Sequence, residues 1–363
     1  MIYRNSKNDS TFIIAEAGVN HNGDFDLAKK LIDVAADSNV DAVKFQTFRV
    51  ESLVTENAPK ATYQKISTSE QESQRQMLEA LEISFPLQFK LMKYAESRGI
   101  IFLSTPFDPA SLDFLLNDIK LETIKIGSGD LTNGPLLLNV ARSRRDVILS
   151  TGMASLSEIE DALAVLAFGF VAGKDAKPNK RAFDDAYVSP DGQKLLQSKV
   201  SLMHCTSEYP CPFNEINLKA ITTLKLAFGL DVGYSDHSQG IHVCLAAVAM
   251  GATIIEKHFT LDKNMKGPDH KSSIEPYELG LLVKQVRDIE AAKGQGVKIP
   301  QPSEIANRQV SRKSLVVTDE TCAGDILELS SIRAGEGVSP MEYWKYNNTP
   351  AKKNYKKGEL FDE

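Results

Sequence analysis

The sequence predicts a (β/α)8 barrel followed by a small β-rich module. Eight short apolar runs alternate with periodic, helix-like segments from residue 11 onward, and this number and spacing are typical of such a barrel. A segment rich in glycine and proline, 293–302, then interrupts the rhythm and is the best domain boundary in the chain. The predicted organisation is a barrel over 1–292, a linker over 293–310 and a small module over 311–363.

The predicted strands are mostly continuous runs of Ile, Val, Leu and Phe, as expected for parallel strands that are buried on both faces. They are 12–18, 42–48, 100–106, 123–128, 146–151, 200–206, 231–236 and 252–260. A doubly wound open sheet is the alternative architecture. No glycine-rich dinucleotide loop follows any of these strands, which favours the barrel.

The predicted helices lie between the strands, and several begin with recognisable caps. Asp24 precedes the helix expected over 25–39, and Ser155 with Glu158 three residues later forms a capping box. Two long polar segments break the pattern. We expect 51–79 to act as a lid and 170–199 to be a solvated insertion, because loops of this length are usually functional or disordered.

The composition is that of an ordinary soluble globular protein, with 42% hydrophobic and 25% charged residues among 363. A net charge of -6 argues against a nucleic-acid partner, which needs a basic face. No apolar run is long enough to span a membrane, and the polar segment 1–9 lacks the apolar core of a signal peptide. The four scattered cysteines favour reduced thiols and a cytoplasmic location.

Polar side chains stand at the end of every predicted strand. In a (β/α)8 barrel the site is built at the carboxyl ends of the strands, so these residues should converge there. The polar residues are Glu16, Lys44, Gln46, Ser104, Thr105, Lys125, Ser128, Asp130, Ser150, Thr151, His204, Thr206, Ser207, Tyr209, Ser235, Asp236, His237, Glu256 and His258.

Two pairs within this set suggest distinct chemistry. His237 and His258 end neighbouring predicted strands, which lie about 4.8 Å apart, and are a plausible half of a metal site. The alternative is that each is a hydrogen-bonded histidine at a strand end. Lys44 and Lys125 are suited to binding a phosphate and a carboxylate. The alternative is that each lysine forms a structural ion pair with Glu or Asp, with Glu16 as one candidate partner.

At this point the motifs resemble those of the sialic acid synthase family. They are Ile14-Ala-Glu-Ala-Gly-Val-Asn-His-Asn-Gly, Lys44-Phe-Gln-Thr-Phe, Leu103-Ser-Thr-Pro-Phe, Lys125-Ile-Gly-Ser-Gly-Asp, Ser150-Thr-Gly-Met, His204-Cys-Thr-Ser-Glu-Tyr-Pro, Tyr234-Ser-Asp-His and Glu256-Lys-His-Phe-Thr. Ser331-Ile-Arg-Ala-Gly-Glu-Gly-Val-Ser-Pro looks like the signature of the family's C-terminal antifreeze-like (SAF) domain. The resemblance covers essentially the whole chain.

The resemblance implies condensation of phosphoenolpyruvate with an N-acylated mannosamine-type sugar, giving a nine-carbon acid and phosphate. It implies that His237 and His258 hold a divalent metal, Mn²⁺ or Mg²⁺, which polarises the sugar aldehyde. Catalytic roles are implied for Glu16, Lys44, Asp130 and Asp269, and substrate-binding roles for Gln46, Thr105, Lys125, Ser128, Ser150, Ser207, Tyr209, Ser235 and Arg333. Glu16 and Asp130 are expected to manage protons, and Arg333 to reach a partner's active site in a domain-swapped homodimer.

The sequence departs from the family pattern at Asp130, where the family often has Glu, and at Ala334, where it usually has Pro. Gly267-Pro-Asp-His-Lys resembles the legionaminate branch more than strict N-acetylneuraminate synthases, so the expected acceptor is 2,4-diacetamido-2,4,6-trideoxymannose or N-acetylmannosamine. The alternatives are a pseudaminic acid synthase, another phosphoenolpyruvate-dependent deoxy-ulosonate synthase that uses a phosphorylated sugar, and a sugar-binding or scaffold protein without activity.

Overall fold

The computed structural model describes residues 10–61, 64–65, 68, 72–173 and 175–363. The polar segment 1–9 lies outside the described residues, as does part of the segment 51–79 that is predicted to be a lid. The chain divides into two compact units, 1–294 and 295–363.

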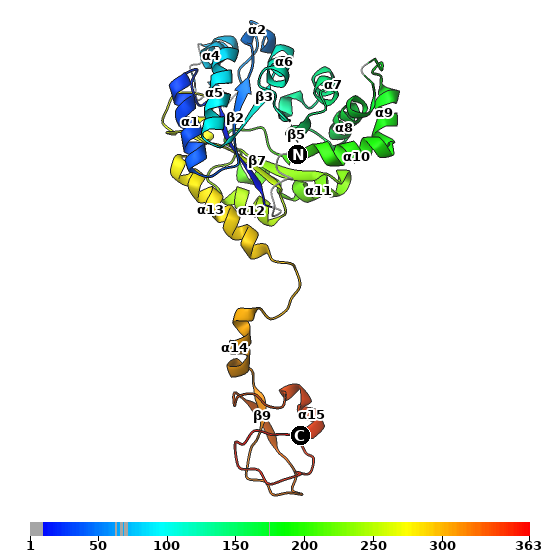
Figure 1. Cartoon of the computed structure of the whole chain (residues 1–363). Helices are drawn as coiled ribbons and strands as arrows, with labels where there is room; N and C mark the ends of the chain where they lie inside the picture. The colour runs from blue at the N-terminus through cyan, green and yellow to red at the C-terminus, as the bar shows by residue number, and fades with distance from the viewer. Residues whose placement is uncertain (1–9, 62–63, 66–67, 69–71, 174) are drawn as a thin grey trace. The chain divides into compact units, whose positions relative to one another are not determined.

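Eight parallel strands form a nearly closed barrel in the first unit, as predicted (Figure 1). Their order is β3-β2-β1-β8-β7-β6-β5-β4, and β3 and β4, at the two ends of this order, pack against each other. The strands are β1 (Phe12–Gly18), β2 (Ala42–Thr47), β3 (Ile101–Pro106), β4 (Thr123–Ile126), β5 (Asp146–Ser150), β6 (Val200–His204), β7 (Asp231–Asp236) and β8 (Ile254–His258).

The interior of the barrel changes from apolar to polar along the strands. Side chains alternate between the two faces of a strand, and the inner positions near the amino ends form a buried cluster of Phe12, Ile14, Ala42, Leu103, Ile148, Met203 and Ile254. This layer is tightly packed at Gly233, where an added Cβ would lie 2.5 Å from the sulfur of Met203 and 2.7 Å from the carbonyl oxygen of Ile254. The next inner positions toward the carboxyl ends carry charged groups.

The outer faces of the strands pack against a ring of helices, and the large apolar core of the unit lies between them. The helices are α1 (Phe25–Asp37), α5 (Phe85–Ser97), α6 (Pro109–Asn117), α7 (Gly134–Arg142), α8 (Leu156–Val171), α11 (Lys219–Phe228), α12 (His242–Ala249) and α13 (Pro276–Lys293). The predicted caps are present: Asp24 accepts from two backbone amides of α1, and Ser155 and Glu158 form the capping box of α8. The shorter helices α2 (Val50–Leu53) and α4 (Gln74–Leu81) lie within 50–81.

The segment 170–199, predicted to be a solvated insertion, has mostly exposed side chains but is not irregular. Helices α9 (Lys180–Val188) and α10 (Pro190–Lys199) occupy most of it and pack against α8. Phe183 of α9 meets Phe168 of α8 edge to face, with ring centroids 5.3 Å apart. Ala186 and Leu196 are buried. The few apolar residues of a charged segment are therefore enough to anchor two additional helices on the barrel.

The second unit is small and has its own core. It contains α14 (Pro302–Ser311), antiparallel β9 (Ser314–Val317) and β10 (Leu329–Ile332), and α15 (Tyr343–Tyr346). The core comprises Leu315, Val317, Leu327, Leu329, Ala351, Tyr355 and Phe361. Helix α14 lies within the predicted linker, so this segment is not wholly irregular. Across the described residues of both units, no helix combines the length and apolar character that a membrane span requires.

Candidate active site

A cavity of about 180 Å³ opens at the carboxyl ends of the barrel strands. This volume is below the roughly 300–1,000 Å³ of pockets that hold drug-sized ligands, so the enclosed part suits a small anion. Strands β1, β2, β3, β4, β5, β7 and β8 contribute the lining residues Glu16, Lys44, Gln46, Thr105, Lys125, Ser150, Ser235, Glu256 and His258. The barrel therefore brings residues together that are more than 200 positions apart in the sequence, such as Glu16 and Glu256.

Two lysines and two glutamates form a buried charge cluster at the base of this cavity. The Lys44 ammonium lies 2.7 Å from Glu16 Oε2 and 3.6 Å from Glu256 Oε2. The Lys125 ammonium lies 3.5 Å from Glu256 Oε1. All four side chains are at most 5% exposed. Their formal charges cancel within the cluster, which is what makes burial of four ionisable groups tolerable.

The two carboxylates of the cluster differ in their protonation. Burial raises the pKa of Glu16 to about 7, although the Lys44 ammonium opposes the shift. Burial also acts to raise the pKa of Glu256, but Lys125 and Lys44 outweigh it and lower this pKa to about 2. Glu256 is therefore the permanent anion of the cluster, whereas Glu16 can take or release a proton near neutral pH.

Hydroxyl groups surround the two ammonium groups. Lys44 donates to Thr105 Oγ1 at 3.1 Å and Lys125 to Ser150 Oγ at 2.7 Å. The hydroxyl of Ser235 donates to Glu256 Oε1 at 2.8 Å. Each lysine is thus oriented by strand side chains. An ammonium group carries three protons, so Lys125, which contacts Ser150 and Glu256, keeps one for an added anion, whereas those of Lys44 face Glu16, Thr105 and Glu256.

A second group of hydroxyls meets at the start of the loop after β5. The backbone amide of Gly152 donates to Ser128 Oγ at 3.1 Å. A Cβ added at Gly152 would lie 2.8 Å from Ser128 Oγ and 2.5 Å from Ser207 Oγ. Glycine at this position therefore lets two hydroxyls approach the same backbone segment, and both of these serines line the cavity.

The two predicted metal-binding histidines lie side by side at the rim. The ring centroids of His237 and His258 are 5.6 Å apart, and the Tyr209 ring lies 4.1 Å from the first and 5.5 Å from the second. His237 Nδ1 lies 2.6 Å from the carbonyl oxygen of Thr206, so Nδ1 donates and Nε2 keeps its lone pair. His258 Nδ1 is buried without a hydrogen-bond partner among the described residues.

Burial keeps both imidazoles neutral. It lowers the pKa of His237 to about 4 and that of His258 well below its usual range. Oδ2 of Asp269 lies 3.9 Å from His258 Nδ1, and burial raises the pKa of Asp269 to about 6. The described residues contain no group of three or more His, Cys, Asp or Glu side chains arranged to hold a metal. Two neutral imidazoles with available lone pairs nevertheless fit a divalent ion that takes its other ligands from water or substrate.

Most of the predicted site residues line this one cavity. They are Glu16, Lys44, Gln46, Thr105, Lys125, Ser128, Ser150, Ser207, Tyr209, Ser235, His237 and His258. Asp130 does not line it: this residue is half-buried beside Asn133, which donates to its carboxylate at 2.9 Å. Asp269 is buried near His258, outside the cavity wall. Arg333 is an exposed residue of the second unit and does not belong to the barrel.

Glu256 contacts both lysines, although the sequence marks it only as a polar residue at a strand end. The signal that identifies it is the two-residue period of β8, because Ile254, Glu256 and His258 share the inner face. Phe107, Met153 and Cys205 also line the cavity without having been predicted.

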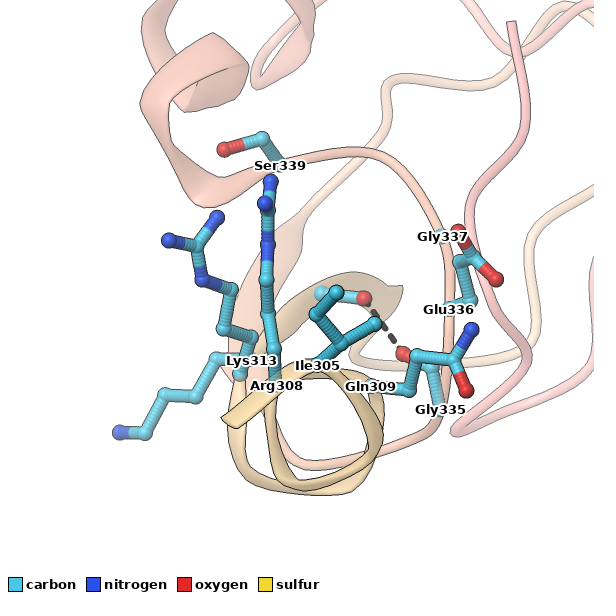
Figure 2. A pocket seen from close by; sticks show the side chains of 10 residues that line it. Ile305, Arg308, Gln309, Lys313, Gly335, Glu336, Gly337 and Ser339 are labelled. Atoms are coloured by element: carbon cyan, nitrogen blue, oxygen red, sulfur yellow. Dashed lines mark hydrogen bonds between the residues drawn. The ribbon is translucent and has the colours of Figure 1, made fainter. Parts of the chain in front are cut away.

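The second unit contains a larger hollow of about 460 Å³, shown in Figure 2. Helix α14, residues 312–314 directly after it and the segment 335–339 line it; the charged lining residues are Arg308, Arg312, Lys313 and Glu336. All four of these side chains are exposed, and Ser314, which donates to the carbonyl oxygen of Gly335, is the buried member of the lining. The hollow therefore lacks the buried, mutually oriented charges of the barrel cavity.

Known proteins similar to this chain share both its sequence and its fold. N,N'-diacetyllegionaminic acid synthase of Campylobacter jejuni is 49% identical over 97% of this chain and 99% of that protein. The enzyme of the same name from Legionella pneumophila is 42% identical over 91% of this chain and 87% of that protein. A solved structure of N-acetylneuraminic acid (sialic acid) synthetase from Leptospira borgpetersenii, in complex with citrate, superposes with a TM-score of 0.65, at 36% identity over 82% of this chain and 91% of that one.

The model of the NeuB family matches residues 31–298, which include most of the barrel and all of the cavity residues except Glu16. This match spans more than half of the chain. The chain belongs to the NeuB family.

Proposed function

We propose that this protein condenses phosphoenolpyruvate with an N-acylated amino sugar to give a legionaminic-type nine-carbon acid and phosphate. Two relatives that are 49% and 42% identical carry the name N,N'-diacetyllegionaminic acid synthase, which supports this product class. The observation that carries the proposal is the buried cluster of Lys44, Lys125, Glu16 and Glu256 beside two neutral histidines. An anion site and an electrophile site lie next to each other there.

In this proposal, phosphoenolpyruvate binds over Lys44 and Lys125. Its phosphate and carboxylate need several donors, and charge-assisted hydrogen bonds from ammonium groups are the strong ones. The hydroxyls of Thr105 and Ser150 accept from the lysines and keep a proton to donate to the substrate, whereas the Ser235 hydroxyl donates to Glu256 and holds it in place. The small enclosed volume of about 180 Å³ suits this three-carbon anion and leaves the acceptor sugar toward the rim.

His237 and His258 would hold the divalent metal, Mn²⁺ or Mg²⁺. Such an ion would supply Lewis-acid polarisation of the sugar aldehyde. The hydrogen bond from His237 Nδ1 to Thr206 fixes the ring so that Nε2, which lies 3.4 Å from the Ser235 hydroxyl oxygen, carries the lone pair that would bind the metal. Tyr209 covers both imidazoles and, with Gln46, would form the wall against which the open-chain sugar lies.

The reaction joins carbon 3 of phosphoenolpyruvate to the aldehyde carbon of the sugar, and the aldehyde oxygen takes a proton. Water then adds to carbon 2 and loses one proton, which leaves a hydroxyl on this carbon. The bond from carbon 2 to the phosphate oxygen then breaks, the hydroxyl oxygen becomes the carbonyl oxygen of the product, and the hydroxyl proton leaves with the phosphate. Glu16, with its pKa raised to about 7 by burial, is the carboxyl group suited to passing these protons at neutral pH. Burial also raises the pKa of Asp130, which is our second candidate, although it stands outside the cavity lining.

We also propose that the second unit is a SAF domain and that Arg333 acts in the site of a second copy. Support comes from the exposure of Arg333 just after β10 and from the separate core of this unit. The test mixes two inactive variants, Arg333→Ala and Glu16→Gln. Activity regained on mixing supports exchange of this unit between copies, and a mixture as inactive as its parts contradicts it.

The proposed function is tested by phosphate release. The protein is incubated with phosphoenolpyruvate, Mn²⁺ and either 2,4-diacetamido-2,4,6-trideoxymannose or N-acetylmannosamine, and the product is identified by mass. We expect kcat/KM to be higher with the diacetamido sugar. Release with a phosphorylated sugar alone would favour a deoxy-ulosonate synthase instead, and no release with any acceptor would contradict the proposal.

A further inference from the structure

A fully buried ion pair lies directly behind the two histidines. The Lys257 ammonium lies 2.9 Å from Asp236 Oδ2, and both side chains are 0% exposed. Asp236 precedes His237 and Lys257 precedes His258 in the sequence. The condensation proposed above uses the inner face of these strands and leaves this pair, on the outer face, without a role.

The register of the barrel places the pair as a link between two strands. Strands β7 and β8 are parallel, and Ser235 pairs with Glu256 and Asp236 with Lys257. Because successive side chains point to opposite faces, Ser235 and Glu256 face the cavity whereas Asp236 and Lys257 face the helices outside. Each member of the ion pair thus directly precedes one of the two histidines and points to the opposite face of the same strand.

The pair is fixed by its neighbours on every side. Asp236 Oδ1 accepts from the hydroxyl of Tyr234 at 3.1 Å and from the amide and hydroxyl of Ser238 at 2.8 and 2.7 Å. Asp236 Oδ2 accepts from the thiol of Cys244 on α12 at 3.1 Å. The Lys257 ammonium also donates to the carbonyl oxygen of Ser238. Residues on both sides of His237 are therefore held to β8 through one ammonium group.

We propose that the Asp236–Lys257 pair is a positioning device that sets the separation and orientation of His237 and His258. This inference rests on the proposed function, because it assumes that the two imidazoles bind the same divalent metal ion. Groups behind the atoms that bind a metal commonly control its affinity, and their loss typically costs about 10–100-fold in affinity or activity. A pair that merely stabilised the fold would be replaceable by uncharged side chains of similar size.

The test compares Lys257→Met, Asp236→Asn and the double variant that carries both changes. Each single variant leaves one buried charge unpaired and should lower the melting temperature, whereas the double variant removes both charges and should regain most of it. Two quantities are then measured for the wild type and for each variant. Titration calorimetry gives the affinity for Mn²⁺ alone, and NMR gives the ring resonances of His237 and His258 in the metal-free protein. Neither readout requires turnover, so both are independent of whether the proposed reaction occurs.

We expect the double variant to fold stably, yet to bind Mn²⁺ about 10–100-fold more weakly and to show shifted resonances for both rings. Its kcat should fall by a similar factor while its KM for phosphoenolpyruvate stays within about 2-fold, because the lysines of the anion site are not moved. If the single variants do not fold, Ser238→Ala is a milder change that removes one hydroxyl donor to Asp236, and it should show the same effects in smaller measure.

A matched control uses the ion pair between Lys199 and Asp146, 3.2 Å apart where β5 begins, at the opposite end of the strands. Lys199→Met should leave both the Mn²⁺ affinity and the ring resonances unchanged. A double variant with restored melting temperature, unshifted histidine resonances and wild-type Mn²⁺ affinity would overturn the proposal, because the pair would then be structural only.

Discussion

The barrel cavity and the hollow of the second unit both contain positive charge, but they hold it in different ways. The barrel cavity encloses about 180 Å³, and its two lysines are buried and oriented by carboxylates and hydroxyls. The hollow encloses about 460 Å³, and its arginines and lysine are exposed. Size alone would select the wrong place. Charges that the fold has desolvated and aimed at a common point identify a site better than the volume around them.

The largest expected effect concerns the ammonium groups. Lys125→Met should lower kcat/KM for phosphoenolpyruvate about 1000-fold, equivalent to about 4 kcal/mol, because a buried, charge-assisted contact to the anion is lost. Steady-state kinetics and phosphoenolpyruvate titration check this. The matched change in the hollow, Arg308→Met, should leave kcat/KM within about 2-fold, since an exposed cation contributes little. Equal losses in both variants would remove the distinction between the two regions.

The next effect concerns stability. Glu256→Gln leaves Lys125 without its carboxylate partner and Lys44 with only Glu16, so the free energy of unfolding should fall by about 3–4 kcal/mol. Chemical denaturation measures this. Glu336→Gln in the hollow is the control and should change stability by less than about 0.5 kcal/mol. A Glu256→Gln protein as stable as wild type would mean that the cluster is solvated rather than buried.

The smallest effect concerns packing. Gly233→Ala places a methyl group against Met203 and the backbone of Ile254, and should destabilise the barrel by about 3 kcal/mol. Gly335→Ala in the hollow meets no atom within 4 Å, but its φ of 91° costs a side chain about 1 kcal/mol. Melting curves of the two variants show which substitution is the more destabilising. A reversed order would show that backbone strain outweighs crowding here.

The sequence predicted the barrel well because parallel strands buried on both faces are short, apolar and regularly spaced. It predicted most of the cavity lining because the carboxyl ends of such strands converge by necessity. It missed α9 and α10 because a charged segment with few apolar residues, among them Phe183 and Leu196, is helical only once α8 is available to pack against. Tertiary contacts, not local propensity, decide such helices.

The importance of Glu256 was hidden for a different reason. Its two lysine partners lie on β2 and β4, far away in the sequence, and no local pattern reveals a charge cluster built from four strands. For Asp130 the error runs the other way, because the sequence suggests a role in the cavity that its position does not support. Its position directly after a strand-end motif suggested the cavity, but the short 3₁₀ turn of residues 128–130 leaves it half-buried beside Asn133 and outside the cavity lining.

The most direct test of the central claim is a crystal structure of the protein soaked with phosphoenolpyruvate and Mn²⁺. We predict density for phosphoenolpyruvate within the barrel, with its anionic groups bound by the ammonium groups of Lys44 and Lys125, and a metal peak between His237 and His258. Density for phosphoenolpyruvate only at Arg308 and Arg312 in the hollow, with the barrel cavity empty, would contradict the account.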